Sequence, residues 1–228
     1  MFGLDESIAA SSDGTSIWIV LAVAVLLGLR HATDPDHLVA VTTLVAGGRE
    51  RAARRAGELG LAWGLGHAGT LFAFGLPIIL LGGVIPQWVQ QAAETAIGVV
   101  IVSLAARLLV RWRRGELHIH AHPQAHGART RRGAFAIGLV HGVGGSAGVG
   151  VLVLASVRST GVAVVSLIVL AVFTAVSMSV VSSGFGWMLA SRPARASSGG
   201  VAPALGAAGL AFGVWYATAA WSLAPYPF

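Results

Sequence analysis

Long apolar segments separated by short polar stretches dominate the chain. A transmembrane helix needs about 20 mainly apolar residues, and six segments of the sequence reach that length. Their approximate bounds are 16–46, 59–82, 88–110, 133–157, 160–190 and 201–223. The pattern predicts an all-α membrane protein with six transmembrane helices, forming a single transmembrane domain over residues 1–228.

The first segment is too long for a straight crossing. Residues 16–46 would form roughly 45 Å of helix, whereas the hydrocarbon core of a bilayer is about 30 Å thick. The segment must therefore tilt or break. Pro35 is the expected position of a break, because proline removes a backbone hydrogen bond and clashes with the preceding turn.

Composition excludes several classes of protein and site. Hydrophobic residues make up 55% of the chain and charged residues 11%, whereas about a quarter of a soluble domain is charged. The net charge of +6 comes from arginines that lie between apolar segments. We therefore expect the lipid bilayer, and no nucleic acid, as the partner of these arginines. The absence of cysteine excludes thiolate metal sites and iron–sulfur clusters.

The arginines also predict how the chain is oriented. They gather in the connections 47–58, 111–132 and 191–200, whereas the alternate connections carry only Arg158 and the termini carry none. Arginine-rich loops face the cytoplasm. We therefore expect a multi-pass protein of the bacterial inner membrane with both termini outside.

Two short matches suggest an internal repeat. Residues 28–31 read Gly-Leu-Arg-His and residues 138–141 read Gly-Leu-Val-His, and the Ile-Gly pair at 97–98 corresponds to the Leu-Gly pair at 205–206. Each half would contain three helices, so the halves would be inserted in opposite orientations. Inverted repeats of this kind are typical of secondary transporters.

A cluster of polar residues interrupts the first apolar segment. Each buried Arg or Asp at the centre of a membrane helix costs roughly 2.5–3.5 kcal/mol, so the cluster requires a compensating role. On a regular helix Asp36 would point away from the other candidates, but unwinding at Pro35 would bring it round and free a carbonyl oxygen as a further ligand. The candidate metal ligands of this cluster are His31, Asp34, Asp36 and His37.

Two further histidines, His67 and His141, lie in other apolar segments. With the predicted orientation, His37, His67 and His141 all lie roughly 12–14 Å from the same membrane face. They could therefore converge on one ion. Imidazole and carboxylate ligands suit nickel, cobalt or zinc, whereas magnesium and calcium prefer oxygen ligands alone.

Several alternatives stay open at this point. His67 and His141 could each hydrogen-bond a neighbouring helix, and the cluster could be a buried polar network that holds helices together. The histidine-rich stretch 118–126 could bind metal loosely or be a solvated linker. Paired histidines on membrane helices could also hold the haem of a b-type haem protein, although the aspartates fit that poorly. No His-Glu-x-x-His motif occurs, and we expect neither an enzyme nor a resident cofactor.

The residues resemble a known family. Residues 30–38 resemble the signature of the nickel/cobalt transporter (NiCoT, or NicO-like) family, whose core of His, four residues, Asp and His falls here on His31, Asp36 and His37. Residues 66–70 resemble a second motif of that family. Residues 141–146 resemble its urease-accessory membrane branch.

The resemblance implies uptake of Ni²⁺ or Co²⁺ as a transported substrate, with His31, Asp36 and His37 recognising the ion. The chain departs from the family in having Pro35 where alanine is more frequent, and longer relatives have eight helices. The identity of the metal, the direction of transport, the coupling ion and the oligomeric state stay open. The alternative function is a membrane accessory factor that delivers nickel to a metalloenzyme.

Overall fold

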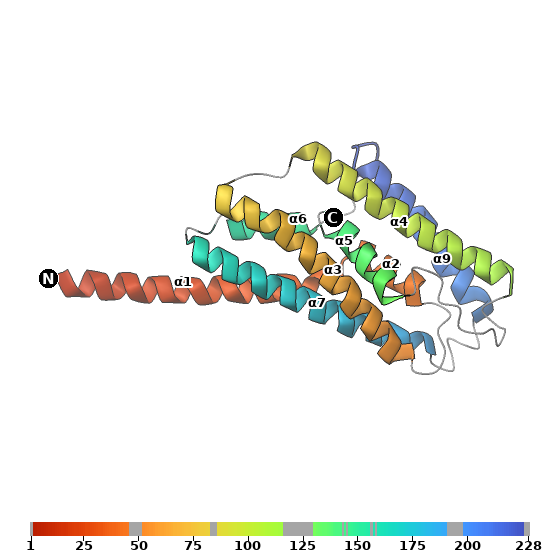
Figure 1. Ribbon diagram of the computed structural model, residues 1–228, viewed down its shortest axis with the longest axis horizontal. Helices are drawn as coiled ribbons and strands as arrows, with labels where there is room; N and C mark the ends of the chain where they lie inside the picture. Colours follow the sequence, from red (N-terminus) through yellow and green to blue (C-terminus); the bar gives the residue numbers. More distant parts are fainter. Residues whose placement is uncertain are drawn as a thin grey trace.

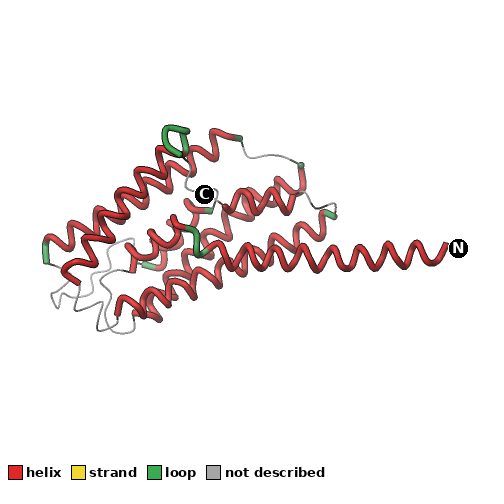
Figure 2. Tube along the Cα trace, turned by 180° about the vertical axis from the view of Figure 1, so that it is seen from behind, coloured by secondary structure: helices red, strands yellow, loops and turns green. Residues whose placement is uncertain are grey.

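The computed structural model describes residues 2–45, 52–82, 86–115, 130–142, 144, 146–155, 157, 159–190 and 198–225. Within these ranges all regular structure is α-helical, as Figures 1 and 2 show. The prediction of an all-α protein is therefore confirmed. The helices are α1 (Phe2–His31), α2 (Pro35–Val45), α3 (Ala52–Leu81), α4 (Gln87–Arg113), α5 (Arg131–His141), α6 (Ser146–Ala155), α7 (Thr160–Ala190) and α9 (Ser198–Ala219).

The first predicted segment is broken directly before Pro35. The helix axes of Ile17–His31 and Pro35–Thr42 differ in direction by 41°. Pro35 begins α2, a position where its missing N–H leaves no helical hydrogen bond unmade. The carbonyl of His31 is not left free as expected, because it accepts the backbone N–H of Asp34 at 3.2 Å.

The fourth predicted segment, 133–157, is not one continuous helix. It forms α5 and α6, which are separated by residues 142–145. Gly142 is the C-cap of α5. The sequence contains glycine at three of these four positions, and each glycine inside a helix costs up to about 1 kcal/mol relative to alanine. The prediction of one continuous helix rested on the high hydropathy of the segment, which does not reveal such a break.

The remaining predicted segments correspond to single helices, and two of these extend further into polar residues than predicted. α3 begins at Ala52 rather than near residue 59, and α4 continues to Arg113 rather than 110. Arg54 Nε lies 3.3 Å from Glu58 Oε1 across one turn of α3, and Arg131 at the start of α5 lies 2.9 Å from Glu58 Oε2. These ion pairs give the polar first turn of α3 side-chain partners on both α3 and α5.

The structure has the properties of a multi-pass membrane protein. Within the described ranges, four helices, α3, α4, α7 and α9, are long and apolar enough to cross a bilayer, and the bent pair α1–α2 makes a fifth if it counts as one span. Large apolar side chains such as Leu26, Leu65 and Val180 point outward. An apolar surface of this kind suits contact with lipid.

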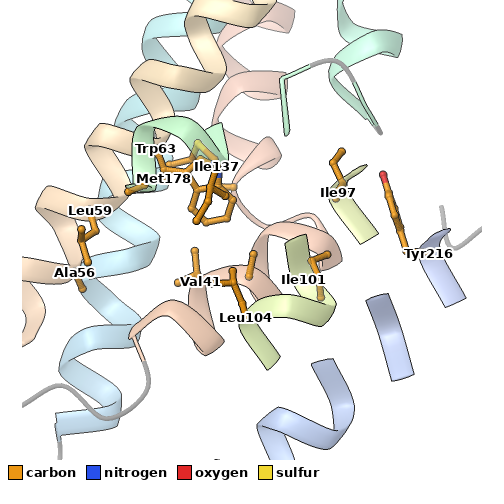
Figure 3. Packing of buried hydrophobic residues seen from close by; sticks show 13 residues of the cluster. Val41, Ala56, Leu59, Trp63, Ile97, Ile101, Leu104, Ile137, Met178 and Tyr216 are labelled. Carbon is orange, nitrogen blue, oxygen red and sulfur yellow. The ribbon is translucent and has the colours of Figure 1, made fainter. Parts of the chain in front are cut away.

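Close helix packing positions the interior. α3 lies along both α5 and α7, α1 lies along α7, and α4 lies along α9 (Figure 1). Glycines permit these approaches: a Cβ atom at Gly28 would lie only 2.8 Å from the carbonyl oxygen of Leu170 in α7. Figure 3 shows Trp63, Ile137 and Met178 on one side of Val41, and Ile101 and Leu104 on the other.

Candidate metal centre

The polar residues singled out from the sequence come together in the interior of the bundle. Three histidines have neighbouring rings: the centroid of His31 lies 4.4 Å from that of His37 and 4.5 Å from that of His67. The ring of His141 lies 5.4 Å from that of His37. All six predicted ligands are buried, namely His31, Asp34, Asp36, His37, His67 and His141.

The first three of these rings form what we call the histidine centre, made of His31, His37 and His67. Each offers a nitrogen, and the three nitrogens lie within 4.8 Å of one another. Ligand nitrogens around one tetrahedral ion are roughly 3.4 Å apart when each bond is about 2.1 Å. Small rotations of the rings would therefore let one ion contact all three.

Two carboxylates adjoin the centre. Asp34, Asp36 and His37 form a second group whose ligand atoms lie within 4.8 Å of one another, so His37 belongs to both groups. The break before Pro35 thus brings Asp36 beside the other candidates, as predicted for unwinding at this proline. Nitrogen and oxygen donors together suit borderline divalent ions such as nickel, cobalt and zinc.

Hydrogen bonds hold one edge of several rings. The Nδ1–H of His37 donates to Oδ1 of Asp36 at 3.1 Å, and the Nδ1–H of His141 donates to the carbonyl of Ile137 at 3.0 Å. Nδ1 of His31 lies 3.3 Å from Oδ2 of Asp34. Metal-binding histidines have this arrangement, because a partner on one nitrogen fixes the ring and directs the other nitrogen to the ion.

The other edges of these rings are where an ion would bind. Nε2 of His37, Nε2 of His141 and both nitrogens of His67 are buried and have no hydrogen-bond partner among the described residues. Buried polar atoms are nearly always hydrogen-bonded. Because a neutral imidazole has one N–H and one lone pair, these three rings offer three electron-pair donors in one region, which would suit a metal cation.

The only cationic side chain described beside the cluster is Arg30, and it lies at the outside. Its Nη2 atom is 3.8 Å from Oδ1 of Asp34, and 64% of its side chain is exposed, against 5% of the Asp34 side chain. The guanidinium of Arg30 would repel a bound cation. Arg30 is therefore expected to pair with an aspartate rather than to contact the ion. Asp34 therefore connects an exposed positive charge with the buried His31.

Packing between α3 and α5 sets the position of His67. A Cβ atom at Gly138 would lie 2.9 Å from the backbone nitrogen of His67. The Thr70 hydroxyl donates to the carbonyl of Leu139 at 2.9 Å. The small residues around His67 thus bring the two helices into backbone contact, with α5 supplying His141 at its end.

Two residues of this region were not singled out from the sequence. Trp63 is fully buried, stacks on His37 with ring centroids 5.3 Å apart, and lies 5.1 Å from the ring of His141. Glu94 on α4 is 2% exposed. A single acidic residue inside the apolar segment 88–110 was the available signal, because intramembrane carboxylates mark functional sites.

The histidine-rich stretch 118–126 lies outside the described residues.

Comparison with known proteins supports one of the resemblances. The chain is 29% identical over 154 residues to the urease accessory protein UreH of Bacillus sp. (strain TB-90), a match that covers 64% of this chain and 67% of the relative. No family profile and no solved structure matches. The relative is named as an accessory protein and not as an enzyme. The resemblance of the chain to the urease-accessory branch is thus confirmed, and the chain is a relative of the urease accessory protein UreH.

Proposed function

We propose that the chain is a secondary transporter that carries Ni²⁺ or Co²⁺ across the membrane and binds the ion at the histidine centre. Asp34, Asp36 and His141 complete the set of ligands and supporting residues. The observation that carries this proposal is the convergence of three buried imidazoles. Two of them, His31 and His37, flank the break in a membrane helix and have Nδ1 beside a carboxylate.

The donor set and the relative favour nickel. Imidazole binds nickel, cobalt and zinc in preference to magnesium or calcium. The relative is an accessory protein of urease, and urease is a nickel enzyme. Nickel is therefore the first substrate to test, with cobalt second.

Six membrane crossings follow if each broken pair counts as one span. α5 and α6 contain 11 and 10 residues, so their lengths are roughly 16 and 15 Å. Neither alone would cross about 30 Å of hydrocarbon, but the two in series would. With α1–α2 as the other broken span, the arginine-rich connections fall on the cytoplasmic side and both termini fall outside.

Reciprocal contacts support the two inverted repeats. Gly28 and Gly138 are 110 residues apart, as are Phe173 and Trp63. Gly28 packs against Phe173 of α7, whereas Gly138 packs against Trp63 of α3. The contacts are those expected if a two-fold axis exchanges α1 with α5 and α3 with α7.

The same relationship holds for the third helix of each half. Gly98 and Gly206 are 108 residues apart, as are Leu109 and Ala217. Gly98 packs against Ala217 of α9, and Gly206 packs against Leu109 of α4. In this arrangement His31 and His141 are the last residues of equivalent helices, each followed by a break. Transporters with inverted repeats build their sites at such broken helices near the middle of the membrane.

A second function shares the same site. The name of the relative favours an accessory factor that receives nickel at the membrane and passes it to a metalloenzyme. The haem alternative is disfavoured, because rings only 4.4 and 4.5 Å apart leave no space for a porphyrin plane between them.

Metal flux into liposomes separates these functions. Purified protein would be reconstituted and offered Ni²⁺, Co²⁺, Zn²⁺ or Mn²⁺, with His37→Ala beside the wild type. Nickel or cobalt uptake that His37→Ala abolishes is the result expected of a transporter. Tight binding without flux would instead support the accessory role. The absence of both binding and flux would show that the histidines form a structural network only.

A further inference from the structure

Glu94 is a buried carboxylate that the proposed ion site does not use. It lies on α4 and is 2% exposed. The side-chain amide of Gln90, one turn nearer the start of the helix, donates to Oε1 of Glu94 at 2.9 Å. A carboxylate inside a membrane helix is costly and is retained mainly where ions or protons pass.

The position of Glu94 connects it to the histidine centre. Gly144 lies in the break between α5 and α6, and a Cβ atom there would be 3.4 Å from Cγ of Glu94. Gly144 follows His141 by three residues, so their Cα atoms are at most about 11 Å apart. Glu94 therefore faces the chain break that begins at His141.

The direction of the helices places Glu94 on one side of the centre. α5 leads from the arginine-rich connection to His141. α6 continues towards the opposite end, because a Cβ atom at Gly75 in the second half of α3 would lie 3.3 Å from Cγ2 of Val151 in α6. Glu94 is near the start of α4, far from its arginine-rich end. Glu94 is thus displaced from the centre towards the α6 end, which the proposed orientation assigns to the outside.

We propose that Glu94, with Gln90 beside it, is a second binding station for the divalent cation, on the route between the outer surface and the histidine centre. This inference rests on the proposed transport function and adds an outer station to it. A fixed negative charge among low-dielectric walls raises the local concentration of cations. Oxygen ligands hold borderline ions more weakly than imidazoles do, so an ion at Glu94 would pass on to the histidines.

The test compares two carboxylate variants of the full-length protein in liposomes. Glu94→Gln keeps the size of the side chain and removes its charge. Glu58→Gln is the matched control, because Glu58 lies at the arginine-rich end of α3, paired with Arg54 and Arg131. The readouts are the initial rate of Ni²⁺ uptake at low concentration and the equilibrium affinity for Ni²⁺.

For Glu94→Gln we expect about a tenfold lower rate of uptake, with the equilibrium affinity changed by less than the rate. Glu58→Gln should match the wild type, and Glu94→Asp should recover part of the rate. An unchanged rate in Glu94→Gln would overturn the inference. Equal losses of rate and thermal stability in Glu94→Gln and Glu94→Asp would also overturn it, because they would mark a packing role.

A second readout keeps this inference separate from the transport function. If wild-type protein carries no flux, the proposed function fails, and the speed with which Ni²⁺ quenches tryptophan fluorescence at the centre still tests Glu94. Slower quenching in Glu94→Gln than in Glu58→Gln would support the outer station. Equal speeds would reject it.

Discussion

The Nδ1 atom of His37 lies 3.1 Å from Oδ1 of Asp36, although the two side chains belong to adjacent residues. On a regular helix, neighbouring side chains diverge by about 100°. Both residues lie in the first turn of α2, which begins at Pro35. The carboxylate thereby fixes the ring of His37 with Nε2 on its opposite edge.

Replacing Asp36 by asparagine tests this orienting role. The amide keeps the size of the side chain but removes the charge that holds Nδ1–H, and loss of such a partner typically weakens metal binding about 10–100-fold. We expect a loss of that size in Ni²⁺ affinity, measured by calorimetry of the purified protein. Glu58→Gln should leave the affinity unchanged. Wild-type affinity in Asp36→Asn would show that this hydrogen bond does not support the site.

Binding should weaken as the solution becomes more acidic. The nitrogens of the histidine centre must be unprotonated to hold an ion, so protons and metal compete. Free imidazole has a pKa of about 6.5, and binding releases protons wherever the empty site carries them. We expect Ni²⁺ affinity to be at least about tenfold lower near pH 5.5 than near pH 7.5, as measured by equilibrium dialysis. Equal affinity at both values would contradict competition between protons and metal at the histidine centre.

Trp63 should report occupation of the centre. Its ring stacks on that of His37 at 5.3 Å with an interplanar angle of 14°, so an ion bound at Nε2 of His37 would lie close to the indole. We expect Ni²⁺ to quench part of the intrinsic fluorescence, and Trp63→Phe to lose that component. Trp187→Phe is the control, since that side chain is exposed. Quenching that Trp63→Phe retains would place the ion elsewhere.

The contact between α3 and α5 should tolerate no added side chain at Gly138. A Cβ atom there would meet the backbone of Trp63 and lie 2.9 Å from the nitrogen of His67. Overpacking of this kind typically costs about 1–3 kcal/mol, so Gly138→Ala should lower the Tm in detergent and weaken Ni²⁺ binding.

Gly184 offers a matched control on α7, because a Cβ atom at that position would meet no described residue within 4 Å. Gly184→Ala should therefore keep the wild-type Tm and affinity. If Gly138→Ala behaved in the same way, the close packing around His67 would not determine the geometry of the centre.

Local chemistry made the break at Pro35 and the clustering of His31 with His37 predictable. A proline flanked by charges, within a segment too long to cross straight, indicates a broken helix at a functional site. Equal depth from one membrane face also placed His67 near His37 before any contact was known. These features depend on residues close in sequence or on the thickness of the bilayer.

Features that depend on contacts between distant segments were not predictable. The break between α5 and α6 had a local signal in the glycines at 142, 144 and 145, but the hydropathy of a segment does not register it. The stacking of Trp63 on His37 and the approach of Gly144 to Glu94 join helices far apart in the chain. The spacing of residues along a single helix does not specify such pairs, because they depend on which faces of different helices pack together.

Equilibrium binding of radioactive nickel to purified wild-type protein and to His37→Ala, with the Tm of each recorded beside it, tests the proposed ion site most directly. His37 belongs to both groups of ligand atoms, so its loss should remove the site without removing the apolar packing of the bundle. We expect one tightly bound Ni²⁺ per wild-type chain and no tight binding to a folded His37→Ala. Unchanged nickel binding in a folded His37→Ala would contradict the assignment of the histidine centre as the ion site.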